Sequence, residues 1–179
     1  SINQANALDN SSEIYFVLLT NKYNYVDYKP YLENIVSKHK NIIIIGNGGS
    51  NSVASHISQD YTKQLDKRCI SFSDPSRLTC YINDYGRDEA YVEFLKDFTD
   101  KDTLVILISS SGNSMNIFNC ARFCKSLGIK FISLSGFDED NRLNTFDGGV
   151  MKYWVDSHDY GVVETAHQIL LHSILGEDD

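Results

Sequence analysis

The sequence lacks long apolar runs and any sizeable basic cluster. Its longest apolar stretches, such as Leu104 to Ile108, fall far short of the roughly 20 residues that a membrane-spanning helix requires. Acidic residues (24) outnumber basic ones (16), the formal net charge is -8, and the longest basic run is Lys38-His39-Lys40. We therefore expect neither a membrane nor nucleic acid as a partner, because binding to a duplex demands a positively charged face.

Cysteine is also sparse, and its spacing does not indicate a zinc knuckle or a small disulfide framework. The four cysteines are Cys69, Cys80, Cys120 and Cys124. Cys120 and Cys124 share one helix face and would suit a metal pair, but we interpret them as small core side chains. Reduced thiols, and a start without the charged-then-apolar pattern of a signal peptide, predict a cytoplasmic protein.

What the sequence does contain is an alternation of apolar strand candidates with helical patterns. Strands are predicted over residues 41–45, 69–72, 104–108, 130–134 and 151–155. Helices are predicted over residues 51–65, 75–81, 89–98, 115–126 and 160–175. Near-continuous Ile, Leu and Val runs in the strands predict an α/β fold, a three-layer α/β/α sandwich around a mostly parallel sheet of about five strands.

The N-terminal part is predicted to be helical and to lie outside the sheet. Helical material from Ser11 to Lys38 falls into two pieces, broken near Tyr25 to Pro30, where Pro30 would suit a first helical turn. We therefore divide the chain into an N-terminal helical segment, residues 1–40, and an α/β domain, residues 41–179.

Two glycine- and serine-rich turns each follow a predicted strand and precede a predicted helix. They are Gly46-Asn47-Gly48-Gly49-Ser50 and Ser109-Ser110-Ser111-Gly112-Asn113-Ser114. In a parallel sheet both lie at the carboxyl ends of strands, where ligands of such folds bind. Backbone N–H groups, hydroxyls and helix N-termini would converge there on one anion, which predicts a site for a phosphate ester held without lysine or arginine.

Neither turn matches a nucleotide-binding loop. The third glycine of a dinucleotide fingerprint would fall at position 51, which is Asn51, and Ser73 precedes Asp74 where the second strand should end in an acidic residue. Neither turn has the Gly-Lys-Ser/Thr ending of a P-loop. For Gly48-Gly49 alone, a tight turn without a ligand stays an alternative, whereas the second turn has more hydroxyl and amide groups than N-capping needs.

Several side chains could perform acid–base or metal chemistry. His56 and Asp60 are four residues apart, so they share one helix face, although a half-buried hydrogen-bonded pair would have the same spacing. The last predicted helix carries Glu164 and His172, and a core histidine is an alternative role for His172 because its neighbours are apolar. The Asn83-Asp84 segment would either contact a sugar or form a turn.

Together these segments resemble the sugar isomerase (SIS) domain family, and within it the sedoheptulose-7-phosphate isomerases, also called phosphoheptose isomerases. Four motifs occur in the family's order between about Asn41 and His172: Gly-Asn-Gly-Gly-Ser, Asn83-Asp84-Tyr85-Gly86, Ser-x-Ser-Gly-Asn-Ser, and Glu-x-x-His-x-x-x-x-His. The resemblance implies an aldose–ketose isomerase that makes D-glycero-D-manno-heptose 7-phosphate for bacterial surface lipopolysaccharide or capsule. It also implies a homotetramer in which N-terminal helices pack between subunits and active sites lie at the interfaces.

Carried over by position, the resemblance also implies roles for individual residues. The phosphate would be held by Ser109, Ser110, Ser111 and Ser114. The sugar would be lined by Asn47, Gly48, Gly49, Asn83, Asp84 and Glu164. A zinc ion, one per site, would be held by His56, Asp60, Glu164 and His172. Because isomerisation requires a base and an acid, we assign Asp60 as the base and His172 as the acid.

Two of these positions differ from the family pattern. Asp60 stands where the family usually has glutamate, and Glu164 where it has glutamine, so the site is more anionic and should favour a divalent cation. Glu164 and His172 are about 12 Å apart along one helix and about 80° apart around it. Either that helix begins after Glu164, or one of the two serves a neighbouring chain's site.

Two other functions stay open at this point. SIS domains also occur as non-catalytic proteins that bind a phosphosugar or a protein partner and regulate, and a fold does not fix a function. An isomerase of another phosphosugar is a third possibility, because none of these residues measures the length of the carbon chain.

Overall fold

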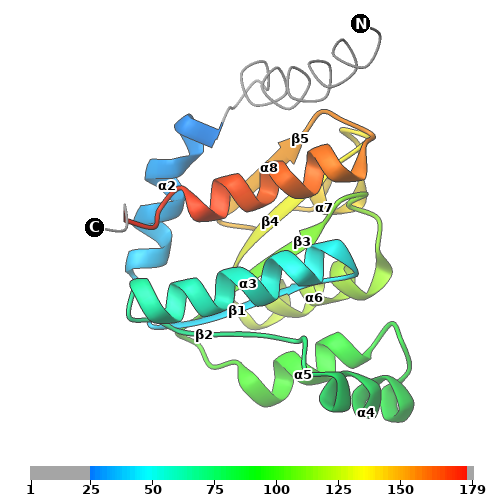
Figure 1. The fold of residues 1–179 in the computed structure, drawn as a ribbon. Helices are drawn as coiled ribbons and strands as arrows, with labels where there is room; N and C mark the ends of the chain where they lie inside the picture. The colour runs from blue at the N-terminus through cyan, green and yellow to red at the C-terminus, as the bar shows by residue number, and fades with distance from the viewer. Residues whose placement is uncertain (1–24, 177–179) are drawn as a thin grey trace, which may run out of the picture.

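Five parallel strands form the centre of the computed structural model, which describes residues 25–176 (Figure 1). They are β1 (Asn41–Gly46), β2 (Arg68–Ser71), β3 (Thr103–Ser109), β4 (Lys130–Gly136) and β5 (Met151–Val155). Their order across the sheet is β2-β1-β3-β4-β5, and every neighbouring pair is parallel. The predicted parallel sheet is confirmed.

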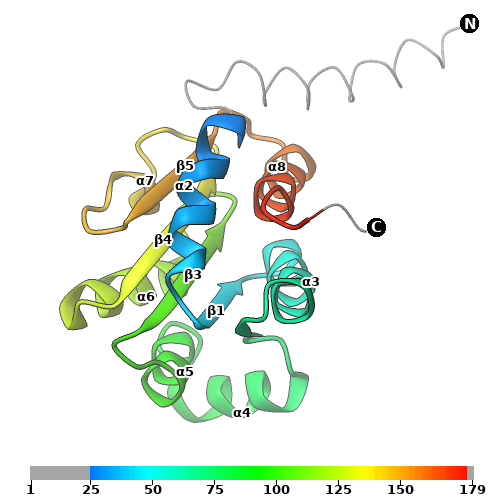
Figure 2. The same ribbon diagram turned by 90° about the vertical axis from the view of Figure 1, so that its left-hand side faces the viewer.

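Helices cover both faces of the sheet, as the apolar strands require (Figure 2). They are α2 (Tyr25–Ser37), α3 (Gly49–Gln64), α4 (Pro75–Tyr85), α5 (Ala90–Phe98), α6 (Met115–Leu127), α7 (Arg142–Thr145) and α8 (Tyr160–His172). Ile42 and Ile44 of β1 pack into a core shared with α2, α3 and α8, whereas Ile43 and Ile45 pack into a second core shared with α5 and α6. The structure is therefore the predicted three-layer sandwich. Over residues 25–176, no helix is both long enough and apolar enough to cross a bilayer.

The N-terminal helix differs from its prediction. Pro30 lies inside α2 and not in its first turn, so the expected helix start at Pro30 is wrong. Leu32 and Val36 of α2 are buried in the core shared with α8, and this packing offsets the hydrogen bond that a proline removes from a helix. The helical piece predicted from Ser11 lies, up to residue 24, outside the described residues.

Other element ends are corrected by local contacts. α4 continues to Tyr85 and ends at Gly86, whose φ of +77° favours glycine, so Asn83 and Asp84 lie in a helical turn and not in a loop. α8 ends at His172, three residues before the predicted end. The short helix α7 was not predicted, and Asn141 caps it by accepting a hydrogen bond from the Asn144 N–H.

The cysteines are free thiols, and the predicted core role of the pair on α6 is confirmed. Cys120 and Cys124 are buried in the second core, and Cys69 is buried on β2. Burial raises the pKa of the Cys124 thiol to about 12. The two thiols therefore pack as small apolar side chains in the core.

Candidate functional site

The two glycine- and serine-rich turns lie side by side at one edge of the sheet. β1 and β3 are neighbours, and Gly46 at the end of β1 pairs with Ile108 near the end of β3. From β1 the chain passes through α3 to β2, and from β3 it passes through α6 to β4 on the opposite side and the opposite face (Figure 2). This divergence creates the crevice in which doubly wound α/β proteins bind ligands.

A cavity of about 210 Å³ occupies this crevice. Its walls are formed by Asn47, Gly48, Gly49, Ser50, Ser109, Ser110, Ser111, Ser114, Tyr160 and Glu164. Glu164 is the only one of these residues that carries a formal charge at neutral pH, and no lysine or arginine is among them. The cavity therefore offers an anion hydroxyl, amide and backbone donors.

Three helices begin at this cavity, and two of them have free N-termini. The N-cap residues of α3 and α6, Gly48 and Ser114, make no side-chain capping hydrogen bond. α8 is different, because the Asp159 carboxylate accepts a hydrogen bond from the Val162 N–H at 3.0 Å. The uncapped N–H groups of α3 and α6, with their helix dipoles, are available to an anion.

The second turn contributes a buried hydroxyl that has no partner among residues 25–176. The side-chain oxygen of Ser109 is shielded from solvent and makes no hydrogen bond. Ser110 Oγ and Ser50 Oγ, in contrast, lie 3.5 Å apart. Leaving a buried hydroxyl unsatisfied costs about 1–3 kcal/mol. A ligand atom in the cavity that hydrogen-bonds to Ser109 Oγ would remove this cost.

Glu164 reaches the cavity because the first turn has no side chain in its way. A Cβ atom at Gly49 would collide with the carboxylate of Glu164, so only glycine leaves room for it there. The carboxylate thus lies beside the first residue of α3, in the wall of the cavity. Burial raises the pKa of Glu164 above its ordinary value.

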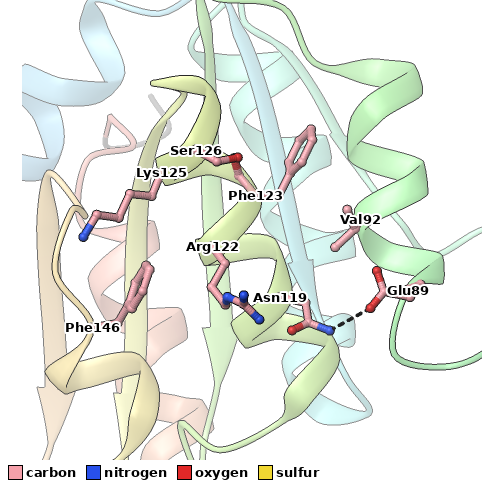
Figure 3. Close-up of a pocket in the computed structure, with 8 residues that line it drawn as sticks. All are labelled: Glu89, Val92, Asn119, Arg122, Phe123, Lys125, Ser126 and Phe146. Atoms are coloured by element: carbon pink, nitrogen blue, oxygen red, sulfur yellow. Dashed lines mark hydrogen bonds between the residues drawn. The ribbon is translucent and has the colours of Figure 1, made fainter.

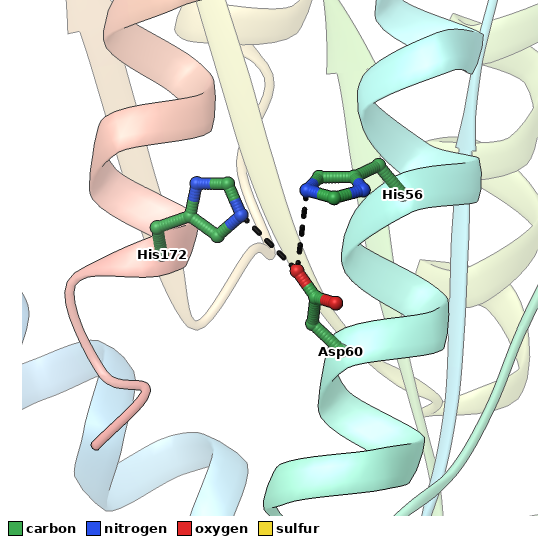
Figure 4. A group of neighbouring side chains, drawn as sticks. All are labelled: His56, Asp60 and His172. Atoms are coloured by element: carbon green, nitrogen blue, oxygen red, sulfur yellow. Dashed lines mark hydrogen bonds and ion pairs between the residues drawn. The ribbon is translucent and has the colours of Figure 1, made fainter. Parts of the chain in front are cut away.

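A second group of functional side chains lies further along α3 and α8, which pack side by side (Figure 4). Asp60 Oδ2 is 3.3 Å from His56 Nε2 and 3.2 Å from His172 Nε2. The two imidazole rings are 5.1 Å apart at 82°. Asp60 is largely buried, while His56 is about half exposed and His172 about one-third exposed. The group thus lies at the border of core and solvent, where the helix pattern predicts His56 and Asp60.

The same three side chains form a donor set that fits a metal ion. One ligand atom from each of His56, Asp60 and His172 lies within 4.8 Å of the other two. Two imidazole nitrogens and one carboxylate oxygen suit zinc, and three protein ligands leave a coordination position for water or substrate. The core-histidine alternative for His172 is wrong, because its ring faces Asp60 and is partly exposed.

Glu164 is separated from that group within one chain. α8 is continuous from Tyr160 to His172, so the alternative in which the helix begins after Glu164 is wrong. Glu164 and His172 are eight positions apart, which corresponds to about 12 Å along the helix axis. The structure therefore brings His56, Asp60 and His172 together and places Glu164 in the glycine–serine cavity.

Asn83 and Asp84 do not join the cavity of their own chain. Both are exposed on α4, where Asn83 Nδ2 donates a hydrogen bond of 3.0 Å to Asp84 Oδ1. Conversely, sequence reasoning missed Ser50 and Tyr160, which line the cavity. Ser50 belongs to the first turn, and Tyr160 follows β5, whose carboxyl end lies at the same sheet edge, so both signals were present in the sequence.

The largest of the described cavities has a different character. This space of about 540 Å³ lies along α5 and α6 and contains none of the predicted site residues (Figure 3). Two of its polar side chains are engaged with other residues that line it: Asn119 donates a hydrogen bond of 3.2 Å to Glu89, and the Lys125 ammonium lies over the Phe146 ring. The smaller cavity at the switch point is therefore the better candidate site.

Comparisons with known proteins agree with the fold and the motifs. The family model of the SIS domain matches residues 31–136. A phosphoheptose isomerase of Fusobacterium nucleatum is 32% identical over 149 residues, which cover 80% of this chain and 75% of that protein. One of Helicobacter pylori is 34% identical over 137 residues, covering 73% of this chain and 70% of that protein.

Solved structures of similar proteins show the same fold. The phosphoheptose isomerase of Neisseria gonorrhoeae superposes with a TM-score of 0.84 and 21% identity, covering 96% of both chains. That of Francisella tularensis superposes with a TM-score of 0.80 and 18% identity, covering 97% of this chain and 95% of the other.

Proposed function

Because the chain belongs to the SIS domain family and to its phosphoheptose isomerases, we propose that it converts sedoheptulose 7-phosphate to D-glycero-D-manno-heptose 7-phosphate. One observation carries the proposal: an anion cavity and a His–Asp–His group lie on the same pair of helices, α3 and α8. A phosphosugar isomerase needs both, one for the phosphate and one for proton transfer.

The cavity supports the phosphate part of the proposal. A phosphate needs several donors, and the helix N-termini, Ser109 and the neighbouring hydroxyls supply them without a cation. The free N-termini of α3 and α6 face the cavity, because these helices follow β1 and β3, whose connections leave the sheet in opposite directions. Neutral donors of this kind suit a substrate that must leave after each turnover.

The His–Asp–His group supports the proton-transfer part. Asp60 is the base that removes a proton from C1 of the ketose and returns it to C2, and His172 is the acid that protonates the C2 carbonyl oxygen. The enediol then gives its O1 proton to His172, which had lost one to O2, while Asp60 returns its proton to C2; this yields the aldose and restores both side chains. Asp60 is oriented for this task because His56 and His172 both contact its Oδ2 atom.

The same residues would hold a divalent ion such as zinc. His56, Asp60 and His172 are the ligands in this chain, and Glu164 of a neighbouring chain would be the fourth. When bound, the ion would supply positive charge that stabilises the oxyanion of the enediolate.

We propose a cytoplasmic homotetramer as the working form, with active sites at subunit interfaces and residues 1–40 packed between subunits. An interface site would also let Asn83 and Asp84 of one chain contact the sugar bound by another. Static light scattering of the purified protein tests the assembly, and a monomer at assay concentration would contradict it. The product would serve surface lipopolysaccharide or capsule.

The activity is tested by mixing the purified protein with sedoheptulose 7-phosphate in D2O, with and without added zinc. We expect aldose formation with deuterium at C2, because the proton on the base exchanges with solvent. Thermal stabilisation by the sugar phosphate without turnover would instead indicate a non-catalytic binding protein. Turnover of a different ketose phosphate only would indicate an isomerase of another phosphosugar.

Removing the unpartnered hydroxyl tests the phosphate site. Ser109→Ala should raise KM about tenfold, the effect of one lost hydrogen bond to a charged group, with kcat nearly unchanged. The melting temperature should not fall, because Ser109 Oγ has no partner in the folded chain. Ser126→Ala, which removes a surface hydroxyl on α6, is the matched control. An unchanged KM in Ser109→Ala would refute the phosphate assignment.

A further inference from the structure

Tyr160 stands at the rim of the anion cavity and belongs to none of the motifs of the sequence. It is the first residue of α8, lines the cavity beside the serine turn and Glu164, and is 60% exposed. A large aromatic side chain with this exposure needs support from its neighbours to keep one position. That support comes from the loop after β4.

Phe137 provides the support through an unusual backbone conformation. Its φ of +59° lies in the left-handed region, which a bulky residue adopts only where the surrounding contacts fix it. Both of its backbone polar groups are held: its N–H donates to the Ser157 carbonyl at 2.9 Å, and its carbonyl accepts from Trp154 Nε1 at 3.2 Å. The loop after β4 is thereby tied to β5 and to the segment that leads into α8.

The ring of Phe137 lies between two other rings. Its centroid is 4.8 Å from that of Tyr160, with an edge-to-face angle of 69°. The His158 ring stacks against Phe137 at 5.3 Å, and His158 Nε2 lies 3.0 Å from Asp138 Oδ1. Aromatic contacts at such distances are favourable beyond the area that they bury. The left-handed backbone of Phe137 thus places its ring where it contacts the Tyr160 ring and holds that ring at the cavity.

On the side of the cavity that α8 forms, the hydroxyl of Tyr160 is the available hydrogen-bond donor. α3 and α6 present free N-termini, but the N-terminus of α8 already donates to Asp159. The phenol of Tyr160 is therefore the neutral donor that α8 can offer to an anion. Its ring would also shield the anion from water, which strengthens the other hydrogen bonds in the cavity.

We propose that Tyr160 binds the phosphate of the substrate and makes the site select phosphorylated sugars, and that Phe137 is the positioning residue that holds it. This inference rests on the proposed function only for the identity of the sugar. The role assigned to the phenol applies to any phosphate monoester and to inorganic phosphate itself.

The test measures separately the effects of the Tyr160 hydroxyl, of the Tyr160 ring and of the contact with Phe137. Tyr160→Phe, Tyr160→Leu and Phe137→Leu are compared with wild type for inorganic phosphate affinity by calorimetry, and for kcat and KM with sedoheptulose 7-phosphate. Tyr160→Phe should weaken phosphate binding and raise KM about tenfold while kcat stays within about twofold. Tyr160→Leu should weaken phosphate binding at least as much as Tyr160→Phe does. Phe137→Leu should weaken it by a smaller factor.

Phe98→Leu is the control, because Phe98 is also exposed and also packs on another ring, Phe94, but lies on α5 away from the cavity. If Tyr160→Phe and Tyr160→Leu bind inorganic phosphate as tightly as wild type and Phe98→Leu, the inference is overturned. If wild type binds phosphate in a Tyr160-dependent way but isomerises no sugar phosphate, the inference stands and the proposed function fails.

Discussion

Asp60→Asn will lower kcat by about 100-fold to 10,000-fold, the range that general acid–base catalysis contributes. Asparagine keeps the size of the side chain and an oxygen for His56 and His172, but it loses the negative charge that makes Asp60 a base. Inorganic phosphate affinity should change little, because the phosphate cavity lies nearer the N-termini of α3 and α8. Steady-state kinetics and calorimetry measure the two effects separately.

Further variants distinguish a catalytic role of Asp60 and His172 from a purely structural one. His172→Gln should show the same loss of kcat, whereas Asp60→Glu, one methylene longer, should retain activity. Asp97→Asn is a suitable control, because Asp97 is an exposed carboxylate that accepts a hydrogen bond from Tyr81 outside the site. Turnover of Asp60→Asn within about threefold of wild type would remove Asp60 from the role of base, since the loss expected for a base is far larger.

Acidification from pH 7 to pH 4 will cost the fold about 3 kcal/mol through His167 alone. Burial lowers the pKa of His167 to about 4, against an ordinary value of 6.5. Well above pH 6.5 the imidazole is neutral in both the folded and the unfolded chain, so its titration does not lower the free energy of unfolding there. Between pH 6.5 and 4 the unfolded chain takes up a proton that the folded chain does not, so the free energy of unfolding falls. Urea unfolding across this pH range measures the slope.

The surroundings of His167 explain why its neutral form is required. The ring is fully buried, its Nε2 donates to the Ser135 carbonyl at 3.0 Å, and its Nδ1 has no partner among residues 25–176. His167→Gln keeps a donor for Ser135 and removes the titration, so its stability should fall less between pH 6.5 and 4. His39→Gln, two residues after the end of α2, is the matched substitution at a partly exposed histidine. An unchanged slope in His167→Gln would show that another group causes the acid sensitivity.

This acid sensitivity bears on the site, because His167 ties α8 to the carboxyl end of β4. Glu164 lies one turn before it, and Tyr160 begins the same helix. Protonation of His167 should therefore loosen the side of the cavity that α8 forms before the whole chain unfolds.

The sequence by itself determined the layers of the fold and the place of the anion cavity. Apolar strand runs and glycine–serine turns are local patterns, and parallel connectivity puts every strand's carboxyl end at one edge. Ser109 and Gly49 could thus be assigned to one site although they are far apart in the chain. The same local logic placed His56 and Asp60 on one helix face.

Only the tertiary structure decided which side chains meet across helices. His172 contacts Asp60 across 112 residues, and Glu164 lies against Gly49 and not with the two histidines, because the packing of α8 on α3 sets both distances. Tyr160 reaches the cavity through the support of Phe137, whose left-handed backbone no local pattern predicts. Periodicity assigns a residue to a face of its own element, whereas contacts between elements depend on how the whole core packs.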